Sequence, residues 1–164
     1  MINPQYCYRK LGESTFIQDY FDSLNSEELV FEDYFGLLVH RLDPEIYLKE
    51  PLLAEINKKY KISQAGFIKT EPWRNYAWHQ DAIRGVGINL LLTPDVNSIV
   101  MFGEGLNNDT VEFSIIPFKY EPRQFYLFNT QIMHTIINFN QPRYLFTIDF
   151  EEDKESLTYE RIQL

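Results

Sequence analysis

The strongest constraint on the fold is a succession of short β-prone segments in the second part of the chain, with no helix-length segment between them. These segments are rich in β-branched and aromatic residues, and we expect strands at about 62–70, 76–80, 86–93, 97–102, 110–118, 124–129, 134–139 and 143–150. Turn-forming residues such as Glu71-Pro72 and Asn140-Gln141-Pro142 separate them. Consecutive short strands without intervening helices predict a barrel or a double-sheet jelly roll.

The N-terminal part shows a different pattern, which indicates helices from Glu13 to about Tyr60. Its first apolar residues recur at helical spacing, namely Phe16, Ile17, Tyr20, Phe21 and Leu24. Ser14 or Thr15 can cap this first helix. A second helical stretch is expected over 44–60, but Pro51 lies inside it, so we expect that stretch to be kinked or divided in two.

The length of 164 residues suits one domain with a single core. Within it we expect a helical part at about 1–60, packed on one outer face of a β core at 62–150. The final stretch, 151–164, begins Glu-Glu-Asp-Lys-Glu and is expected to be a solvated tail or a short last element. The 13 phenylalanines and 11 tyrosines also favour a β-rich core.

Charge and cysteine content exclude several classes of function. The formal charge of -9 and the absence of a basic patch make a nucleic-acid partner unlikely. Cys7 is the only cysteine, so an intramolecular disulfide and a cysteine-based zinc site are excluded, and a reducing compartment fits. No segment resembles a signal peptide or a membrane span. We therefore expect a cytoplasmic protein without a membrane partner, whereas the sequence leaves the oligomeric state open.

Two of the three histidines lie in the strand-rich part and carry the clearest chemical signal. His79 and Asp81 are two positions apart, so in an extended chain their side chains point to the same side. His134 begins a strand four or five strands later, and a jelly roll can bring that strand alongside the one that carries His79. Two imidazoles and one carboxylate leave three positions of an octahedral metal open, which is typical of non-haem Fe(II).

Arg143 begins the next expected strand, directly after the turn at 140–142. Strands that flank a tight turn are usually neighbours, so an antiparallel pairing would place this arginine near the metal, facing in from the same side. Its guanidinium matches a carboxylate in bidentate fashion. A dicarboxylate that chelates iron at one end needs such a partner at its other end.

Each of these residues has an ordinary explanation when it is taken alone. A His-x-Asp pair arises easily by chance, a histidine on an apolar strand often belongs to the core, and an arginine is usually a solvated surface charge. The combination of all four residues in this order favours a functional site. His40 lies before any expected strand, with its nearest aspartate three positions on, so we interpret it as structural.

At these residues the sequence resembles the 2-oxoglutarate-dependent oxygenases, whose signature is His-x-Asp/Glu, a distant His and then Arg. The segments 79–84, 87–90 and 134–138, followed by Arg143, look most like the aspartyl/asparaginyl β-hydroxylase and proline hydroxylase branch. The resemblance covers about residues 62–150. It implies a mainly β fold, a double-stranded β-helix of the jelly-roll or cupin-like kind, with the N-terminal helices packed on one face.

The resemblance also implies an activity, which is hydroxylation of an unactivated C–H bond while 2-oxoglutarate and O₂ become succinate and CO₂. His79, Asp81 and His134 would hold Fe(II), and Arg143 would bind the 5-carboxylate of 2-oxoglutarate. The remaining candidates in the pocket are Arg84 and Asn89, as contacts to the cosubstrate or to a substrate carboxylate, and Asn138 and Thr147, as lining residues. The presence of Asp81 argues against a halogenase, because those relatives leave the carboxylate position open for halide.

The substrate itself is not encoded in these motifs. A free amino acid, a peptide side chain or another small molecule all fit the resemblance, and repair of alkylated nucleic acid is disfavoured by the negative charge. A jelly-roll module that binds a metal or ligand without turnover is the alternative from a different class. Trp73 and Trp78 flank the iron pair in the sequence and form either a pocket wall or part of the aromatic core.

Overall fold

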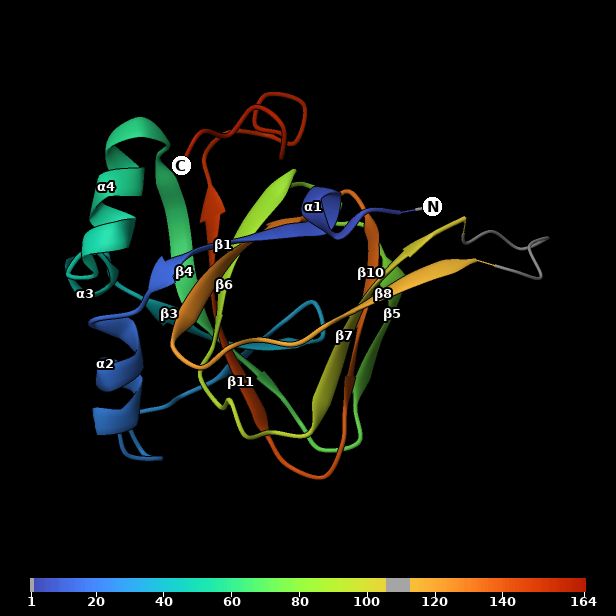
Figure 1. The fold of residues 1–164 in the computed structure, drawn as a ribbon. Coiled ribbons are helices and arrows are strands. Elements are labelled where there is room, and N and C mark those ends of the chain that lie inside the picture. The colour runs from blue at the N-terminus through green and yellow to red at the C-terminus, as the bar shows by residue number, and fades with distance from the viewer. Residues whose placement is uncertain (1, 106–112) are drawn as a thin grey trace.

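The computed structural model describes residues 2–105 and 113–164, and most of its regular structure is β-strand (Figure 1). Its strands are β1 (Tyr8–Glu13), β2 (Glu32–Tyr34), β3 (Leu37–Leu42), β4 (Ile62–Thr70), β5 (Asn75–His79), β6 (Val86–Leu91), β7 (Ser98–Glu104), β8 (Ser114–Phe118), β9 (Gln124–Asn129), β10 (Met133–Asn138) and β11 (Arg143–Phe150). The eight strands from β4 onward match the predicted ones closely. The start of the segment expected at 110–118 lies outside the described residues.

The strands form two antiparallel sheets that face each other (Figure 1). The seven-stranded sheet has the order β1-β9-β6-β11-β4-β3-β2, and the four-stranded sheet has the order β5-β10-β7-β8. Neighbours in space are therefore rarely neighbours in sequence, as expected for a jelly roll. This arrangement confirms the predicted double-stranded β-helix.

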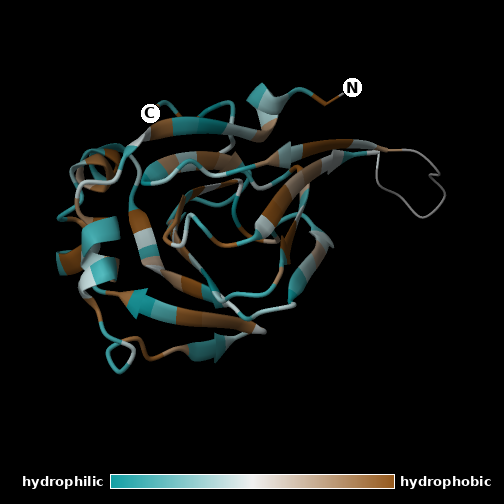
Figure 2. Ribbon diagram, turned by 60° about the horizontal axis from the view of Figure 1, so that its bottom comes forward, coloured by the Kyte–Doolittle hydropathy of each residue, from teal (hydrophilic) through white to brown (hydrophobic). Residues whose placement is uncertain are grey.

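The central part of the larger sheet is covered on both of its faces, whereas the edge strand β2 is exposed. One face packs against the helices through a cluster that includes Leu53, Phe67 and Phe146, and the other packs against the smaller sheet through a cluster that includes Phe102 and Phe128. Every residue of β6 is buried as a consequence. Figure 2 shows the matching pattern, with hydrophobic segments along the strands and hydrophilic segments in many of the connections.

The helices are α1 (Pro4–Cys7), α2 (Ile17–Ser23), α3 (Pro44–Tyr47) and α4 (Pro51–Lys59). The last three lie together on the outer side of the larger sheet, as predicted (Figure 1). The expected division at Pro51 is also confirmed, because this proline starts α4, where its missing N–H is not needed. None of the described helices has the length and apolar character that crossing a membrane requires.

The cap of α2 differs from the one expected from the sequence. The side chain that caps this helix belongs to Glu50, which directly precedes α4. Its buried carboxylate accepts hydrogen bonds from the backbone N–H groups of Thr15, Phe16 and Ile17 at 2.9 to 3.2 Å. Ser14 contributes in a second way, since its Oγ accepts the Gln18 N–H at 3.1 Å. Tertiary contact thus replaces a local cap and ties α2 to the start of α4.

The prediction that residues 1–60 are helical is wrong for three segments. β1 pairs with β9, and the hairpin of β2 and β3 extends the larger sheet beside β4. Strand pairing decides these segments, since β1 joins the distant strand β9, while β2 and β3 form a hairpin that joins the edge of β4. The helical periodicity of this part of the sequence did not indicate such pairing. His40 therefore lies in β3, where its ring stacks on Phe67 with centroids 5.8 Å apart, and its structural interpretation agrees with this packing.

The C-terminal stretch is not a solvated tail. Leu157, Tyr159 and Ile162 are buried in the core cluster on the helix-covered side of the larger sheet, although no helix or strand forms there. This stretch also passes close to Gly85, where a Cβ atom would lie only 2.3 Å from the Leu157 carbonyl oxygen. The acidic start of the segment suggested solvation, but three apolar residues later in it determine its place.

Candidate metal centre and its cavity

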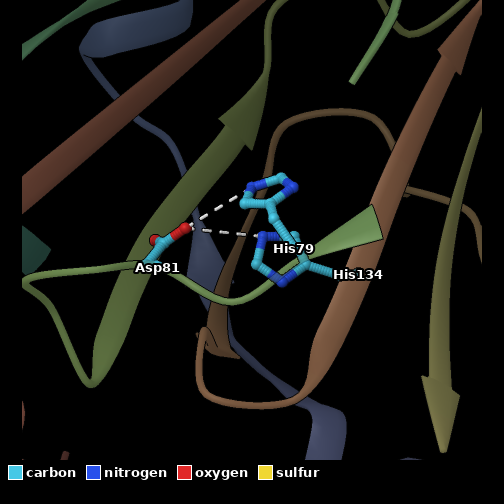
Figure 3. Close-up of side chains that lie close together, drawn as sticks. All are labelled: His79, Asp81 and His134. Atoms are coloured by element: carbon cyan, nitrogen blue, oxygen red, sulfur yellow. Dashed lines mark ion pairs between the residues drawn. The ribbon is translucent and has the colours of Figure 1, made fainter. Parts of the chain in front are cut away.

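His79, Asp81 and His134 converge at one end of the smaller sheet (Figure 3). β5 and β10 pair antiparallel with His79 directly opposite His134, which confirms that the fold brings these two strands together. Asp81 follows β5 after one residue. Its Oδ1 atom lies 3.6 Å from Nε2 of His79 and 3.7 Å from Nε2 of His134. One ligand atom from each residue lies within 4.8 Å of the other two.

Both imidazoles are oriented by their own strands. Nδ1 of His79 lies 2.7 Å from the carbonyl oxygen of Ala77, and Nδ1 of His134 lies 2.9 Å from that of Ile132. A carbonyl only accepts hydrogen bonds, so each Nδ1 carries the proton and each Nε2 presents a lone pair toward Asp81. Burial also lowers the pKa of His134, which favours its neutral, metal-binding form. The donor set of two imidazoles and one carboxylate fits a divalent transition metal with open positions.

The carboxylate is fixed through the backbone around it. The Asp81 N–H donates to the Thr130 carbonyl at 3.0 Å, and the Asp81 carbonyl accepts from Gln131 Nε2 at 2.9 Å. Its side-chain Oδ2 accepts a hydrogen bond from Nε of Arg84. The segment between β5 and β6 is therefore held in place although it is neither strand nor helix.

Next to the three residues lies an inner cavity of about 440 Å³. Arg143 lines it and is completely buried, and its Nε, Nη1 and Nη2 atoms have no hydrogen-bond partner among the described residues. The guanidinium carbon lies 5.8 Å from the centre of the Tyr120 ring. Burial lowers the pKa of Arg143, because desolvation disfavours its charged form. A buried cation without a partner is costly, and a ligand anion in the cavity would offset that cost.

The route by which Arg143 reaches the cavity differs from the prediction. β10 and β11 lie in different sheets and do not pair, so the expected hairpin is wrong. β10 is already flanked by β5 and β7, and both of its edges are hydrogen bonded. The chain therefore crosses to the larger sheet after β10. Arg143 begins β11 near the end of β10 and not near its start, where His134 lies (Figure 1).

The remaining predicted residues lie in different places. Arg84 and Asn89 line the inner cavity, and Oδ1 of Asn89 is buried without a hydrogen-bond partner among the described residues. Thr147 lines the outer cavity described below, where its Oγ1 accepts from Arg84 Nη1 at 3.2 Å. Asn138 lines neither of these cavities, and its Nδ2 donates to the carbonyls of Thr70, Glu71 and Gln141 at 2.8 to 3.2 Å. Asn138 thus braces the turn before β11.

An outer cavity of about 660 Å³ adjoins the inner one. Six residues line both cavities, namely Phe35, Leu37, Ile68, His79, Asp81 and Arg84. His79 and Asp81 therefore lie between the two spaces, whereas His134 lines only the inner one. Phe35 stands at the tip of the hairpin of β2 and β3, has 91% of its surface exposed and adopts a φ of 52°. No sequence pattern indicated this wall, because the hairpin lies in the part that was expected to be helical.

The two tryptophans occupy neither of their predicted positions. Trp73 is 71% exposed, and Trp78 lies with its ring 6.3 Å from that of Phe113. Neither lines either cavity. Tyr120, which the sequence did not single out, stands beside Arg143 instead, and no local pattern distinguished it from the many other tyrosines of the chain.

No protein-family model matches this sequence, and no curated protein matches it. Solved structures do. A prolyl hydroxylase from Trichoplax adhaerens, in complex with a hypoxia inducible factor peptide fragment, is 11% identical with a TM-score of 0.60 over 88% of this chain and 83% of its own. A 2OG-Fe(II) oxygenase family protein from Burkholderia pseudomallei is 10% identical with a TM-score of 0.58, over 95% and 88%. A prolyl-4-hydroxylase from Pseudomonas putida is 16% identical with a TM-score of 0.54, over 88% and 92%.

This chain has the fold of the 2-oxoglutarate and Fe(II)-dependent oxygenases. The likeness extends over most of each chain, including the N-terminal part. At such low identity it is a likeness of fold, and the chemistry has to be argued from this chain's own residues.

Proposed function

We propose that the chain is an Fe(II)- and 2-oxoglutarate-dependent dioxygenase that hydroxylates an unactivated C–H bond. The observation that carries this proposal is Arg143, a fully buried cation that has no hydrogen-bond partner among the described residues and lines the same cavity as three residues that could hold a metal. A cosubstrate with a chelating end and a carboxylate end would satisfy both groups at once. A binding site for a lone metal would leave Arg143 without an explanation.

Each residue of the triad has a defined part in this proposal. His79 and His134 would hold Fe(II) through Nε2, since each Nδ1 is committed to a backbone carbonyl. Asp81 would provide Oδ1, which already faces both imidazoles. The chemistry that the bound metal supplies is activation of O₂ at the expense of 2-oxoglutarate, which leaves as succinate and CO₂ while the substrate gains a hydroxyl group.

The inner cavity would hold the cosubstrate. Arg143 would bind the 5-carboxylate in bidentate fashion, and the free Oδ1 of Asn89 is available to accept a hydrogen bond from a ligand or a water molecule nearby. Part of the wall is apolar, with Val100, Ile136 and Leu145 among its residues. Such a wall excludes water and strengthens the pairing between guanidinium and carboxylate.

The outer cavity would hold the substrate, because it adjoins the metal ligands from the other side. A small molecule, a free amino acid or the side chain of a peptide fits its size, and similar structures include prolyl hydroxylases, one of which contains a peptide. The net charge of -9 argues against nucleic acid. A cytoplasmic location would provide both iron and 2-oxoglutarate.

The test is an anaerobic titration of the metal-free protein with Fe(II) and then with 2-oxoglutarate. We expect a weak visible charge-transfer band that requires both additions, followed by succinate formation when O₂ is admitted. His134→Ala should lose the band through loss of iron, and Arg143→Ala should need far more 2-oxoglutarate to form it. If wild type forms neither the band nor succinate, the protein is instead a jelly-roll module that binds a metal or ligand without turnover.

A further inference from the structure

The two carboxylate oxygens of Asp81 have different partners. Oδ1 faces the Nε2 atoms of His79 and His134, and Oδ2 accepts the hydrogen bond from Nε of Arg84. A carboxylate can bind a metal through one oxygen or through both. The contact with Arg84 therefore bears directly on how Asp81 presents itself to a metal.

Arg84 is held from its other side by β11. Its Nη1 donates to Oδ1 of Asp149 at 2.7 Å and lies 3.2 Å from Thr147 Oγ1 and 3.4 Å from the Ile148 carbonyl oxygen. The guanidinium lies over Gly87 of β6, where a Cβ atom would be only 3.2 Å from Nη1. The arginine thus bridges the segment that carries Asp81 and the larger sheet.

Asp149 and the backbone carbonyl of Arg84 have further hydrogen-bond partners of their own. The second oxygen of Asp149 accepts from Gln64 Nε2 at 2.6 Å, and Gln64 Oε1 accepts from Arg41 Nη1 at 2.5 Å. The carbonyl of Arg84 itself accepts from Thr130 Oγ1 and Gln131 Nε2 at 2.7 and 2.8 Å. Burial opposes the charge of Arg84, but Asp81 and Asp149 together raise its pKa above the ordinary value. Moving the Arg84 side chain to bind a cosubstrate would break its contacts with Asp81, Asp149 and Thr147.

We propose that Arg84 is a positioning residue that makes Asp81 a one-oxygen metal ligand, and that Asp149 is the counter-charge that keeps Arg84 in place. This rests on the proposed metal site and assigns Arg84 a role other than contact with the cosubstrate. Occupying Oδ2 leaves only Oδ1 for the metal, so a second coordination position stays open. Asp149 shares the guanidinium charge, which would otherwise fall wholly on Asp81 and weaken its attraction for a dication.

The experiment is a titration of the metal-free protein with Co(II). The visible absorption of the bound Co(II) is recorded during the titration, because it reports the number and geometry of the ligands. Arg84→Met should weaken Co(II) binding by about tenfold, as loss of a group that orients a metal ligand commonly does, and should change the absorption spectrum. The matched control is Arg123→Met, because Arg123 also lies between two carboxylates, Asp19 and Glu13, but away from both cavities. The control should bind Co(II) with wild-type affinity and spectrum.

Asp149→Asn provides an independent variant, because it leaves the hydrogen bond between Arg84 and Asp81 in place. Binding should weaken by less than in Arg84→Met, with little change in the spectrum. If Arg84→Met binds Co(II) as wild type does, with the same spectrum, the positioning role is overturned. If Arg84→Met does not fold, wild-type affinity in Asp149→Asn overturns the proposal. If instead His134→Ala binds Co(II) as well as wild type, the metal site and the proposed function fail together.

Discussion

Two arginines line the inner cavity, Arg84 and Arg143, and their surroundings are opposite. Arg84, beside the metal ligands, pairs with the carboxylates of Asp81 and Asp149. Arg143 begins β11, is more deeply buried, and has no carboxylate or other hydrogen-bond partner among the described residues. The same side chain thus supports the protein in one place and is available to a ligand in the other.

The difference shows which arginine to associate with a ligand. A guanidinium with carboxylates on two sides already has its charge balanced, so a ligand anion gains little there. A buried guanidinium without an anionic partner gains much more from a ligand anion, because the cost of its desolvation is already part of the folded state. Substitutions at the candidate metal site and at Arg143 test this contrast.

The largest effect is expected from His134, which is proposed to hold the metal in the same cavity. His134→Ala removes one of only three protein ligands, so binding of Fe(II) and turnover of 2-oxoglutarate should be abolished while the fold remains intact. Metal content after reconstitution, together with circular dichroism, measures both. Stoichiometric iron and full activity in this variant would remove His134 from the site.

Loss of Arg143 should produce the next largest effect, in the affinity for 2-oxoglutarate alone. Arg143→Ala leaves the 5-carboxylate without a partner, at a cost of about 3–5 kcal/mol, or about two to four powers of ten in affinity. Arg143→Lys should recover only part, since an ammonium lacks the planar fork. Anaerobic titration of the iron-loaded proteins measures this. An affinity of Arg143→Ala within about threefold of wild type would break the contrast and transfer the role to another cation, with Arg84 the first suspect.

The same contrast predicts that a substitution of Arg143 that removes 2-oxoglutarate binding increases the free energy of unfolding of the ligand-free protein. Arg143→Met fills the site with an apolar side chain of similar length and removes an unpaired buried charge, so the ligand-free protein should become more stable by about 1–3 kcal/mol. Urea unfolding of the metal-free protein measures the change. A loss of stability would mean that the guanidinium has partners that offset its burial, such as the Tyr120 ring or ordered water.

The smallest expected effect concerns the protonation of His134. Burial disfavours the charged form of this side chain, as it does for Arg143. The pKa of His134 in the folded protein is lowered by burial, whereas the unfolded chain titrates near 6.5. Between these two values the unfolded state binds more protons, so the stability of the metal-free protein should fall as the pH drops below about 6.5. Comparing urea unfolding at about pH 7.5 and 5.5 for wild type and His134→Gln isolates this contribution. An equal pH dependence in both proteins would contradict it.

The sequence by itself determined the β segments, and it predicted the chemistry that their side chains would carry. Alternation, turn residues and aromatic content located the strands from β4 to β11, because these are local properties of the backbone and side chains. The order of His79, Asp81, His134 and Arg143 indicated a metal and a carboxylate ligand before any contact was known. The pairing of β5 with β10 agrees with what that order required.

Tertiary structure alone decided how the remaining parts meet. Strand β1 pairs with the distant strand β9, the hairpin of β2 and β3 joins the edge of β4, and the C-terminal stretch is buried through three apolar side chains. β10 and β11 separate into different sheets because both edges of β10 are already occupied. Arg84 and Arg143 look alike in the sequence, but packing gave Arg84 two carboxylate partners and gave Arg143 none within the part of the chain that the structure describes. Such differences depend on which strands become neighbours, and that is a property of the whole fold.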